Sequence, residues 1–399
     1  MKTLRLKPEI SIPEHLTGEI QSKLAYVDET ITRATVHPDS IELIIDPSSL
    51  DDPEGLSPVK EAEITRKVHK IITSMAKGAI KPKIQVLEDH MDRPVSYNLD
   101  PNSELLRIGE LSQEGNGFYT IGPLVSGVID FFEEQFLNLA DSINAKPYRF
   151  PTLISAEMLD RVGYFSAFPH SLSFVTHLRE DLDVIDNFAQ NTKFIPGGLN
   201  TSSESFARIQ TLLSPAVCYH LYFSLADKQL PGGQLAATGV NNCFRYEAIN
   251  LNSLERLWNF TMREIIFVGS KDYVLDNREA GRKRMQEFFD TIDFVYRVES
   301  ANDPFFIGEF RKQAAFQSAF QLKFEIRASL PFKQETLAVG SYNYHQDFFG
   351  RNLNITLEDG SPAHTSCVAF GLERIAYAFL AQFGLDPVGW PEPVKVSVK

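Results

Sequence analysis

The sequence contains little cysteine: its 399 residues include three, Cys218, Cys243 and Cys367. An odd number at wide spacing argues against a disulfide framework and leaves metal binding or simple burial as roles for the thiols. Apolar runs of membrane-spanning length are absent, and the first residues alternate and soon meet proline, unlike a signal peptide. We therefore expect a cytoplasmic protein that has no membrane as a partner.

Positive charge is also scarce. The chain has 39 Lys and Arg against 52 Asp and Glu, which gives a formal net charge of −13. It lacks a Lys/Arg-rich segment or a basic coiled coil of the kind that grips tRNA phosphates, so tRNA is not the partner that we expect. The remaining composition, 43% hydrophobic and 23% charged, is that of a globular protein, and the length predicts a large core and two domains.

The first 104 residues predict a small α/β accessory domain. Strand-like and helical segments follow one another in the order β-α-β-β-α-β, which is typical of a ferredoxin-like sandwich. The predicted strands are residues 3–12, 30–36, 40–45 and 83–87, and the predicted helices are residues 14–27 and 58–75. We find no catalytic constellation in this part. Turn residues at 98–116 predict a link to a second domain, residues 105–399.

The most informative stretch is residues 243–269. An Arg-x-Glu pair, Arg245 and Glu247, follows an apolar segment, a polar loop comes next, and the apolar residues 265–268 predict a returning strand. A planar guanidinium can hold phosphate bidentately, and a carboxylate can accept a hydrogen bond from the amino group of adenine. The pair therefore predicts a nucleotide triphosphate site, although a solvated pair on a surface strand gives the same pattern.

The sequence around this pair resembles motif 2 of the class II aminoacyl-tRNA synthetases. It looks most like motif 2 of the seryl-type branch and of its shortened relatives, the amino acid:[carrier protein] ligases. Residues 366–375, SCVAFGLERI, lead into the apolar helix 376–383 and resemble motif 3. The long helix 120–144, followed by a proline-bearing strand at 148–153, resembles motif 1, which implies a homodimer. The resemblance covers residues 105–399 and implies an α+β fold, an antiparallel sheet flanked by helices.

The resemblance also implies how ATP is held. Adenylation brings a carboxylate to the α-phosphorus of ATP, so two anions must be positioned and neutralised. Arg245 would hold the α-phosphate and the incoming carboxylate, and Glu247 would read the adenine amino group. Arg256 would grip the outer phosphates and Arg374 the γ-phosphate. Arg245, Glu247 and Arg374 are therefore the expected catalytic residues.

Departure of pyrophosphate also calls for Mg²⁺. Seryl-type enzymes place an acidic ligand for it before motif 3, but Ala338 occupies the nearest matching position here. Glu335 and Asp347 remain as alternative ligands.

A second constellation is formed by Cys218, Glu264 and Cys367. Thiolate sulfur and carboxylate oxygen suit Zn²⁺, and three protein ligands leave a fourth position open. Spacing alone gives no metal motif. The three positions match a Cys–Glu–Cys zinc site of the carrier-protein ligases and the atypical archaeal seryl-tRNA synthetases. This resemblance implies that the metal binds the substrate's free amino group and selects small amino acids. We expect Cys243 to be a buried core thiol.

Two further segments resemble substrate-lining parts of the same ligases. Residues 164–170 match a GYF-x-x-FP signature near the active site, and residues 341–350 are too polar for a core strand yet rich in aromatic residues. The second segment supplies Asn343, His345 and Asp347 as substrate-binding candidates. His345 and Asp347 lie two apart on a predicted strand, hence on one face. They would orient the substrate or the thiol acceptor, or form a structural pair.

The expected activity is ATP-dependent activation of a small amino acid and its transfer to the phosphopantetheine thiol of an acyl or peptidyl carrier protein. One alternative keeps the adenylation but ends on tRNA, as in an atypical seryl-tRNA synthetase. Another is a non-catalytic paralogue that binds amino acids. Loss of the motif arginines or the metal ligands would mark that paralogue, and all of them are present.

Overall fold

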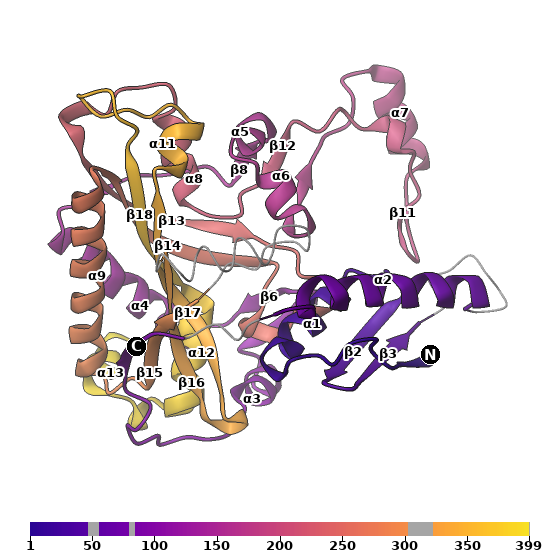
Figure 1. Cartoon of the computed structure of the whole chain (residues 1–399), viewed down its shortest axis with the longest axis horizontal. Coiled ribbons are helices and arrows are strands. Elements are labelled where there is room, and N and C mark those ends of the chain that lie inside the picture. The colour runs from indigo at the N-terminus through magenta and orange to yellow at the C-terminus, as the bar shows by residue number, and fades with distance from the viewer. Residues whose placement is uncertain (47–55, 80–83, 302–321, 399) are drawn as a thin grey trace.

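The structure, a computed structural model, describes residues 1–46, 56–79, 84–301 and 322–398 (Figure 1). Its centre is an eight-stranded sheet in the order β4-β15-β16-β17-β18-β14-β13-β7, antiparallel except where β7 joins β13. The strands are β4 (Val86–Asp89), β7 (Lys146–Pro147), β13 (Leu235–Phe244), β14 (Asn259–Gly269), β15 (Tyr296–Ser300), β16 (Lys323–Leu330), β17 (Glu335–Gln346) and β18 (His364–Gly371). The expected antiparallel sheet is therefore present.

Three helices cover one face of this sheet: α4 (Pro123–Ser142), α9 (Lys271–Thr291) and α12 (Leu372–Phe383). Alternate residues of the strands pack against them, so that Ile265 and Phe267 of β14 lie in the same core as Val368 and Phe370 of β18. Within this core the rings of Phe136 and Phe370 stack with centroids 3.8 Å apart. The intervening residues of β14 and β18 point to the opposite face, where Ile266 and Val268 join a second core cluster and Glu264 is buried.

The N-terminal unit has a three-stranded sheet in the order β1-β3-β2 and lies to one side of the large sheet (Figure 1). Its elements are β1 (Lys2–Leu6), α1 (Thr17–Leu24), β2 (Ile31–His37), β3 (Ser40–Ile45) and α2 (Pro58–Ala76). The predicted helical stripe of α2 is buried on the sheet. These elements confirm five of the six that the sequence predicted.

The sixth element is not in this sheet. The strand predicted at 83–87 is β4, which pairs with β15 at the edge of the large sheet, so the four-stranded ferredoxin-like sandwich was wrong. A tertiary contact decides its place: buried Glu88 forms an ion pair with Arg282 of α9 and accepts a hydrogen bond from the Tyr296 hydroxyl at 2.8 Å. Strand propensity does not reveal such partners.

The stretch predicted as a linker, residues 98–116, is also structured. It holds α3 (Pro101–Arg107) and β5 (Leu111–Gly115), which pairs with β6 (Phe118–Ile121). Leu105 and Leu111 are buried in the core of the large sheet. We propose that the N-terminal unit ends before β4 rather than at residue 104.

Most of the remaining elements cover the face of the large sheet opposite these three helices, whereas α13 packs against α4. The strand expected at 148–153 is not formed as one element: β7 ends before it and β8 begins at its last residue, Leu153. Pro151 between them offers no N–H to a ladder, and the Pro151 carbonyl accepts a hydrogen bond from Asn241 Nδ2 at 2.8 Å. In the described part, helices that are long and apolar enough to cross a membrane are absent. The other elements are β8 (Leu153–Ser155), α5 (Ala156–Arg161), α6 (Tyr164–Ala167), β9 (Phe174–Val175), α7 (Leu182–Asn191), β10 (Phe194–Ile195), β11 (Gly198–Leu199), β12 (Thr211–Leu213), α8 (Cys218–Ser224), α11 (Phe348–Asn352) and α13 (Glu392–Ser397).

Candidate active site

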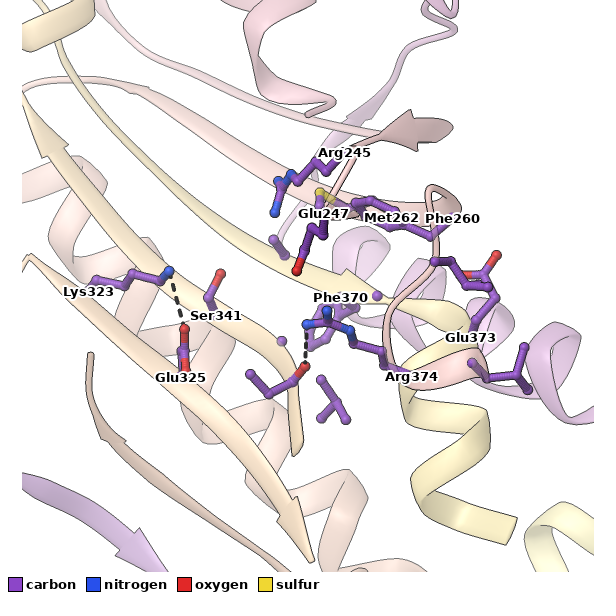
Figure 2. A pocket seen from close by; sticks show the side chains of 17 residues that line it. Arg245, Glu247, Phe260, Met262, Lys323, Glu325, Ser341, Phe370, Glu373 and Arg374 are labelled. Carbon is purple, nitrogen blue, oxygen red and sulfur yellow. Dashed lines mark hydrogen bonds and ion pairs between the residues drawn. The ribbon is translucent and has the colours of Figure 1, made fainter. Parts of the chain in front are cut away.

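A cavity opens on the face of the large sheet opposite the three helices, between the loop that joins β13 to β14 and the strands β16, β17 and β18 (Figure 2). Arg245, Glu247 and Arg374, the three expected catalytic residues, all line it. Arg256 forms an ion pair with Glu247. The structure thus brings together the four residues that the sequence assigned to ATP.

The β13–β14 pair positions the first two of these residues. The strands pair in register up to Phe244 opposite Asn259, and Arg245 follows directly. Its Nε donates a hydrogen bond to the Pro215 carbonyl at 3.0 Å, and its guanidinium carbon lies 5.4 Å from the centre of the Phe260 ring. One hydrogen bond and one ring contact therefore aim the planar group into the cavity.

Glu247 lies among guanidinium groups. Burial works to raise the pKa of this carboxyl, but the charges of Arg256 and Arg374 outweigh burial and hold the pKa below its usual value. The carboxylate is therefore ionised at neutral pH and available as an acceptor. Arg374 enters from the first turn of α12, where its Nη1 donates to the Ala338 carbonyl at 3.2 Å.

Glu373 also borders the cavity, in a structural role that the sequence did not indicate. Both of its carboxylate oxygens accept from the Thr261 backbone N–H at 2.8 Å, and this ties the start of α12 to β14. Burial raises the pKa of Glu373.

The sequence reasoning missed Lys323 and Glu325, which line the cavity from β16. Lys323 Nζ lies 3.3 Å from the Glu325 carboxylate, and Arg327 Nη1 lies 2.9 Å from it. These cations outweigh burial and lower the pKa of Glu325. Ser341 of β17 stands directly opposite Glu325 in the ladder. In β16 the charged residues Lys323, Glu325 and Arg327 alternate with apolar ones, and this pattern could have predicted that the three share one face of the strand.

The two carboxylates proposed for Mg²⁺ from the sequence lie elsewhere. Glu335 is exposed and lies 3.3 Å from the ammonium of Lys333. Asp347 accepts a hydrogen bond from Arg351 Nε at 2.6 Å and borders a separate cavity. Ala338 does line the main cavity, so its apolar side chain stands where the resemblance expects an acid.

Cys218, Glu264 and Cys367 meet beside this cavity. They come from α8, β14 and β18, all three are buried, and their ligand atoms lie within 4.8 Å of one another. Among the described residues, one carboxylate oxygen of Glu264 has no hydrogen-bond partner. Burial and the charge of Cys367 raise the pKa of Glu264 to about 8. Such a buried, acceptor-rich set fits a cation that neutralises it.

The third cysteine is separate from this cluster. Cys243 is fully buried and packs against Val217 and Met262. Burial raises the pKa of its thiol. The expected core thiol is confirmed.

Two of the three substrate-binding candidates lie near the cysteine cluster. Asn343 Nδ2 donates to Cys367 Sγ at 3.4 Å and to Ser341 Oγ at 2.9 Å, so this amide links the cluster to the main cavity. His345 Nδ1 lies 3.1 Å from Thr365 Oγ1.

The sequence predicted that Asp347 and His345 share one face of a strand, and this was wrong. The ladder between β17 and β18 shifts register between Tyr344 and Gln346, and Gln346 has a φ of 54° in the left-handed region. The strand ends there, so the two-residue alternation no longer applies. Asp347 turns to Arg351 on α11 instead.

No protein-family model matches the chain. Amino acid–[acyl-carrier-protein] ligase 2 of Bradyrhizobium diazoefficiens is 36% identical over 286 residues, which span 70% of this chain and 84% of the relative. Ligase 1 of the same organism is 38% identical over 248 residues, 62% of this chain and 74% of the relative. The type-2 serine–tRNA ligase of Methanococcus aeolicus is 26% identical and covers 80% of this chain and 63% of its own.

Solved structures show the same fold. The Methanopyrus kandleri seryl-tRNA synthetase, in complex with Aquifex aeolicus tRNASec, has a TM-score of 0.72 at 20% identity and covers 99% of this chain and 77% of its own. The cytoplasmic serine–tRNA ligase of Naegleria fowleri, in complex with AMP, has a TM-score of 0.61 at 15% identity, over 85% of this chain and 72% of its own. The fold is that of the class II synthetases, and by its relatives the chain belongs to the family of the amino acid–[acyl-carrier-protein] ligases.

Proposed function

We propose that this ligase activates a small amino acid with ATP and transfers the aminoacyl group to the phosphopantetheine thiol of a carrier protein. One observation carries the proposal: the arginine-lined cavity and the cysteine cluster share two strands. Met262 of β14 and Ala369 of β18 line the cavity. Glu264 lies two residues after Met262, and Cys367 lies two residues before Ala369 on the antiparallel strand. Residues two apart on a strand share a face, so sites for a nucleotide and for an amino group adjoin.

The cavity suits adenylate formation. A carboxylate oxygen of the amino acid attacks the α-phosphorus, the bond to the bridging oxygen breaks, and pyrophosphate leaves. Arg245 would hold the α-phosphate and the carboxylate together, so that the charge of both anions is neutralised before reaction. Arg256 and Arg374 would bind the outer phosphates, and Glu247 would accept from the adenine amino group. Glu325 and Ser341 are the carboxylate and hydroxyl that the cavity offers to Mg²⁺.

The cysteine cluster suits one Zn²⁺ per chain. Cys218, Glu264 and Cys367 would hold it. The Glu264 carboxylate oxygen that has no hydrogen-bond partner among the described residues supports this fit. A bound ion would supply a Lewis-acid position for the substrate's amino group in its neutral form, because an ammonium group has no lone pair to donate. Asn343 would restrain the Cys367 sulfur and thereby the orientation of that position. A preference for small amino acids is what the resemblance to the zinc-dependent family implies for a buried site of this kind.

In the second step the thiol sulfur attacks the adenylate carbonyl, a thioester forms, and AMP leaves. The names of the Bradyrhizobium relatives support a carrier protein as the source of the thiol. The net charge of −13 argues in the same direction, since a tRNA surface needs positive charge. The long helix α4 with β7 supports a homodimer, as the motif 1 resemblance implies.

A tRNA acceptor is the second candidate, because the likeness to the Methanopyrus seryl-tRNA synthetase extends over 99% of the chain. Pyrophosphate exchange with a panel of amino acids identifies the substrate first. The activated amino acid is then offered to a phosphopantetheinylated carrier protein and, separately, to bulk tRNA. Mass spectrometry should show an aminoacyl thioester on the carrier. Robust charging of tRNA, with no aminoacyl group added to the carrier protein, would overturn the proposal. The carrier protein without phosphopantetheine is the control.

A further inference from the structure

The N-terminal unit contacts the loop that carries Glu247. Asn250, in the short helix Ala248–Asn250 that follows Glu247, donates a hydrogen bond from Nδ2 to the Ser22 carbonyl of α1 at 3.0 Å. On the other side of Glu247, the Tyr246 carbonyl accepts from the Tyr26 hydroxyl at 3.3 Å. The two hydrogen bonds therefore bracket Glu247 with residues more than 200 positions away in the sequence.

A buried ammonium lies in the same interface. Lys23 of α1 is 4% exposed, which is rare for lysine because the charge loses its water. Two carboxylates offset that loss: Glu19, one turn earlier on α1, and Glu247 of the loop. Burial lowers the pKa of Lys23, and the charges of Glu19 and Glu247 act against burial. Glu247 thus has Arg256 as its ion-pair partner and Arg374 as a further cation within the site, and its charge also acts on Lys23 of the N-terminal unit.

Aromatic rings complete the contact. The Tyr26 ring meets the His170 ring edge to face, with centroids 4.9 Å apart. Next to His170, the Ser171 carbonyl accepts from the Tyr246 backbone N–H at 3.0 Å. The loop also contains Ala248 at a φ of 50°, a conformation that L-residues rarely adopt and that surrounding contacts must maintain. These contacts fix the backbone on both sides of Glu247.

We propose that Lys23 and Tyr26 are positioning residues that hold Glu247 in the orientation that reads adenine. The N-terminal unit is then part of the nucleotide site and not only an accessory domain. Tyr26 holds the backbone before Glu247, and Lys23 is the buried cation of α1, the helix whose Ser22 carbonyl holds Asn250 after it. The inference rests on the proposed function, in which Glu247 accepts from the adenine amino group. It predicts a defect in base recognition that loss of general stability would not produce.

Two nucleotides separate base recognition from phosphate binding. ATP carries the 6-amino group, whereas inosine triphosphate carries a 6-keto oxygen that cannot donate to Glu247. Pyrophosphate exchange is measured with each nucleotide for the full-length wild type, Lys23→Met and Tyr26→Ala. Lys2→Met is the matched control, because Lys2 of the same unit pairs with Glu61 far from the loop. Glu247→Gln is the benchmark, because its amide can also donate to the keto oxygen.

In Lys23→Met and Tyr26→Ala we expect the KM for ATP to rise about tenfold. The KM for inosine triphosphate and for the amino acid should stay within about twofold of wild type, so the preference for ATP falls. Lys2→Met should behave as wild type. If a Lys23 variant does not fold, Asn250→Ala tests the same contact, since it removes only the hydrogen bond to Ser22, and should lower the preference in the same direction.

Folded variants that keep the wild-type preference, while Glu247→Gln loses it, would overturn the positioning role and leave the proposed function intact. If Glu247→Gln also keeps the preference, the adenine assignment itself fails, and the positioning role fails with it. The benchmark variant therefore tells the two failures apart.

Discussion

At the scale of single residues, the cysteine cluster gives the sharpest test. Because Cys218 and Cys367 lie within ligand distance of Glu264, Cys218→Ala with Cys367→Ala should reduce bound zinc from about one per chain to near zero. The measurement is metal analysis of protein purified without added metal. Cys243→Ala is the matched control and should keep its zinc, since that thiol lies in a separate core cluster. Full zinc occupancy in the double variant would refute the site.

Arg374 should matter for catalysis more than for folding. Its side chain is half-buried, the loss of water lowers the pKa of its guanidinium, and one hydrogen bond to the Ala338 carbonyl holds it. A charge kept in such a place costs stability unless a ligand uses it. Arg374→Ala should cut pyrophosphate exchange by about tenfold or more, as loss of a charge-assisted bond worth about 1.5–3 kcal/mol requires.

Thermal unfolding completes this test, and Tm should stay near that of wild type. Arg351→Ala is the matched control, because Arg351 pairs with Asp347 outside the main cavity. Exchange at the wild-type rate in the Arg374 variant would show that the nucleotide is misplaced. Arg245→Ala should behave in the same way.

At the scale of elements, close packing fixes α11 against the segment before β18. A Cβ on Gly350 would lie 2.2 Å from the Ala363 carbonyl oxygen, and backbone cannot move aside as a side chain does. Gly350→Ala should therefore lower the free energy of unfolding by about 1–3 kcal/mol. Gly18→Ala in α1 meets nothing within 4 Å and should be neutral or slightly stabilising. Equal melting temperatures for the two variants would contradict this account.

Elements also show what the sequence could predict. The placing of Arg245, Glu247 and Arg374 in one cavity was accessible through the resemblance to motifs 2 and 3, whose residues are contiguous in sequence. The separation of His345 and Asp347 was not, because the register shift that causes it arises from pairing with β18. The place of β4 was hidden for a similar reason. Its partners, Arg282 and Tyr296, are about 200 residues away.

At the scale of the whole molecule, net charge predicts how the acceptor is found. A chain of −13 gains nothing from long-range attraction to a polyanion. Transfer to a carrier protein should therefore change by less than about threefold between 50 and 200 mM salt, whereas a tRNA-binding surface loses affinity by about 10³–10⁵ over this range. Initial rates of thioester formation measure it. A steep fall with salt would indicate an extended basic contact that the composition does not suggest.

The shared strands β14 and β18 fix the distance between the nucleotide cavity and the cysteine cluster. Two residues along a strand span about 6.8 Å, and this step separates the cavity lining at Met262 from the metal ligand at Glu264. On the proposed function, the groups that reach in from the two ends of this step set a fixed spacing at which the carboxylate and the amino group of one substrate are held. One extra methylene between the two groups breaks the fit, so β-alanine should lose about 10–200-fold in kcat/KM for exchange relative to alanine. Equal values would show that the spacing is adjustable. A loss of the expected size would place the choice between α- and β-amino acids in the backbone, where no single side-chain replacement in the cavity can relax it.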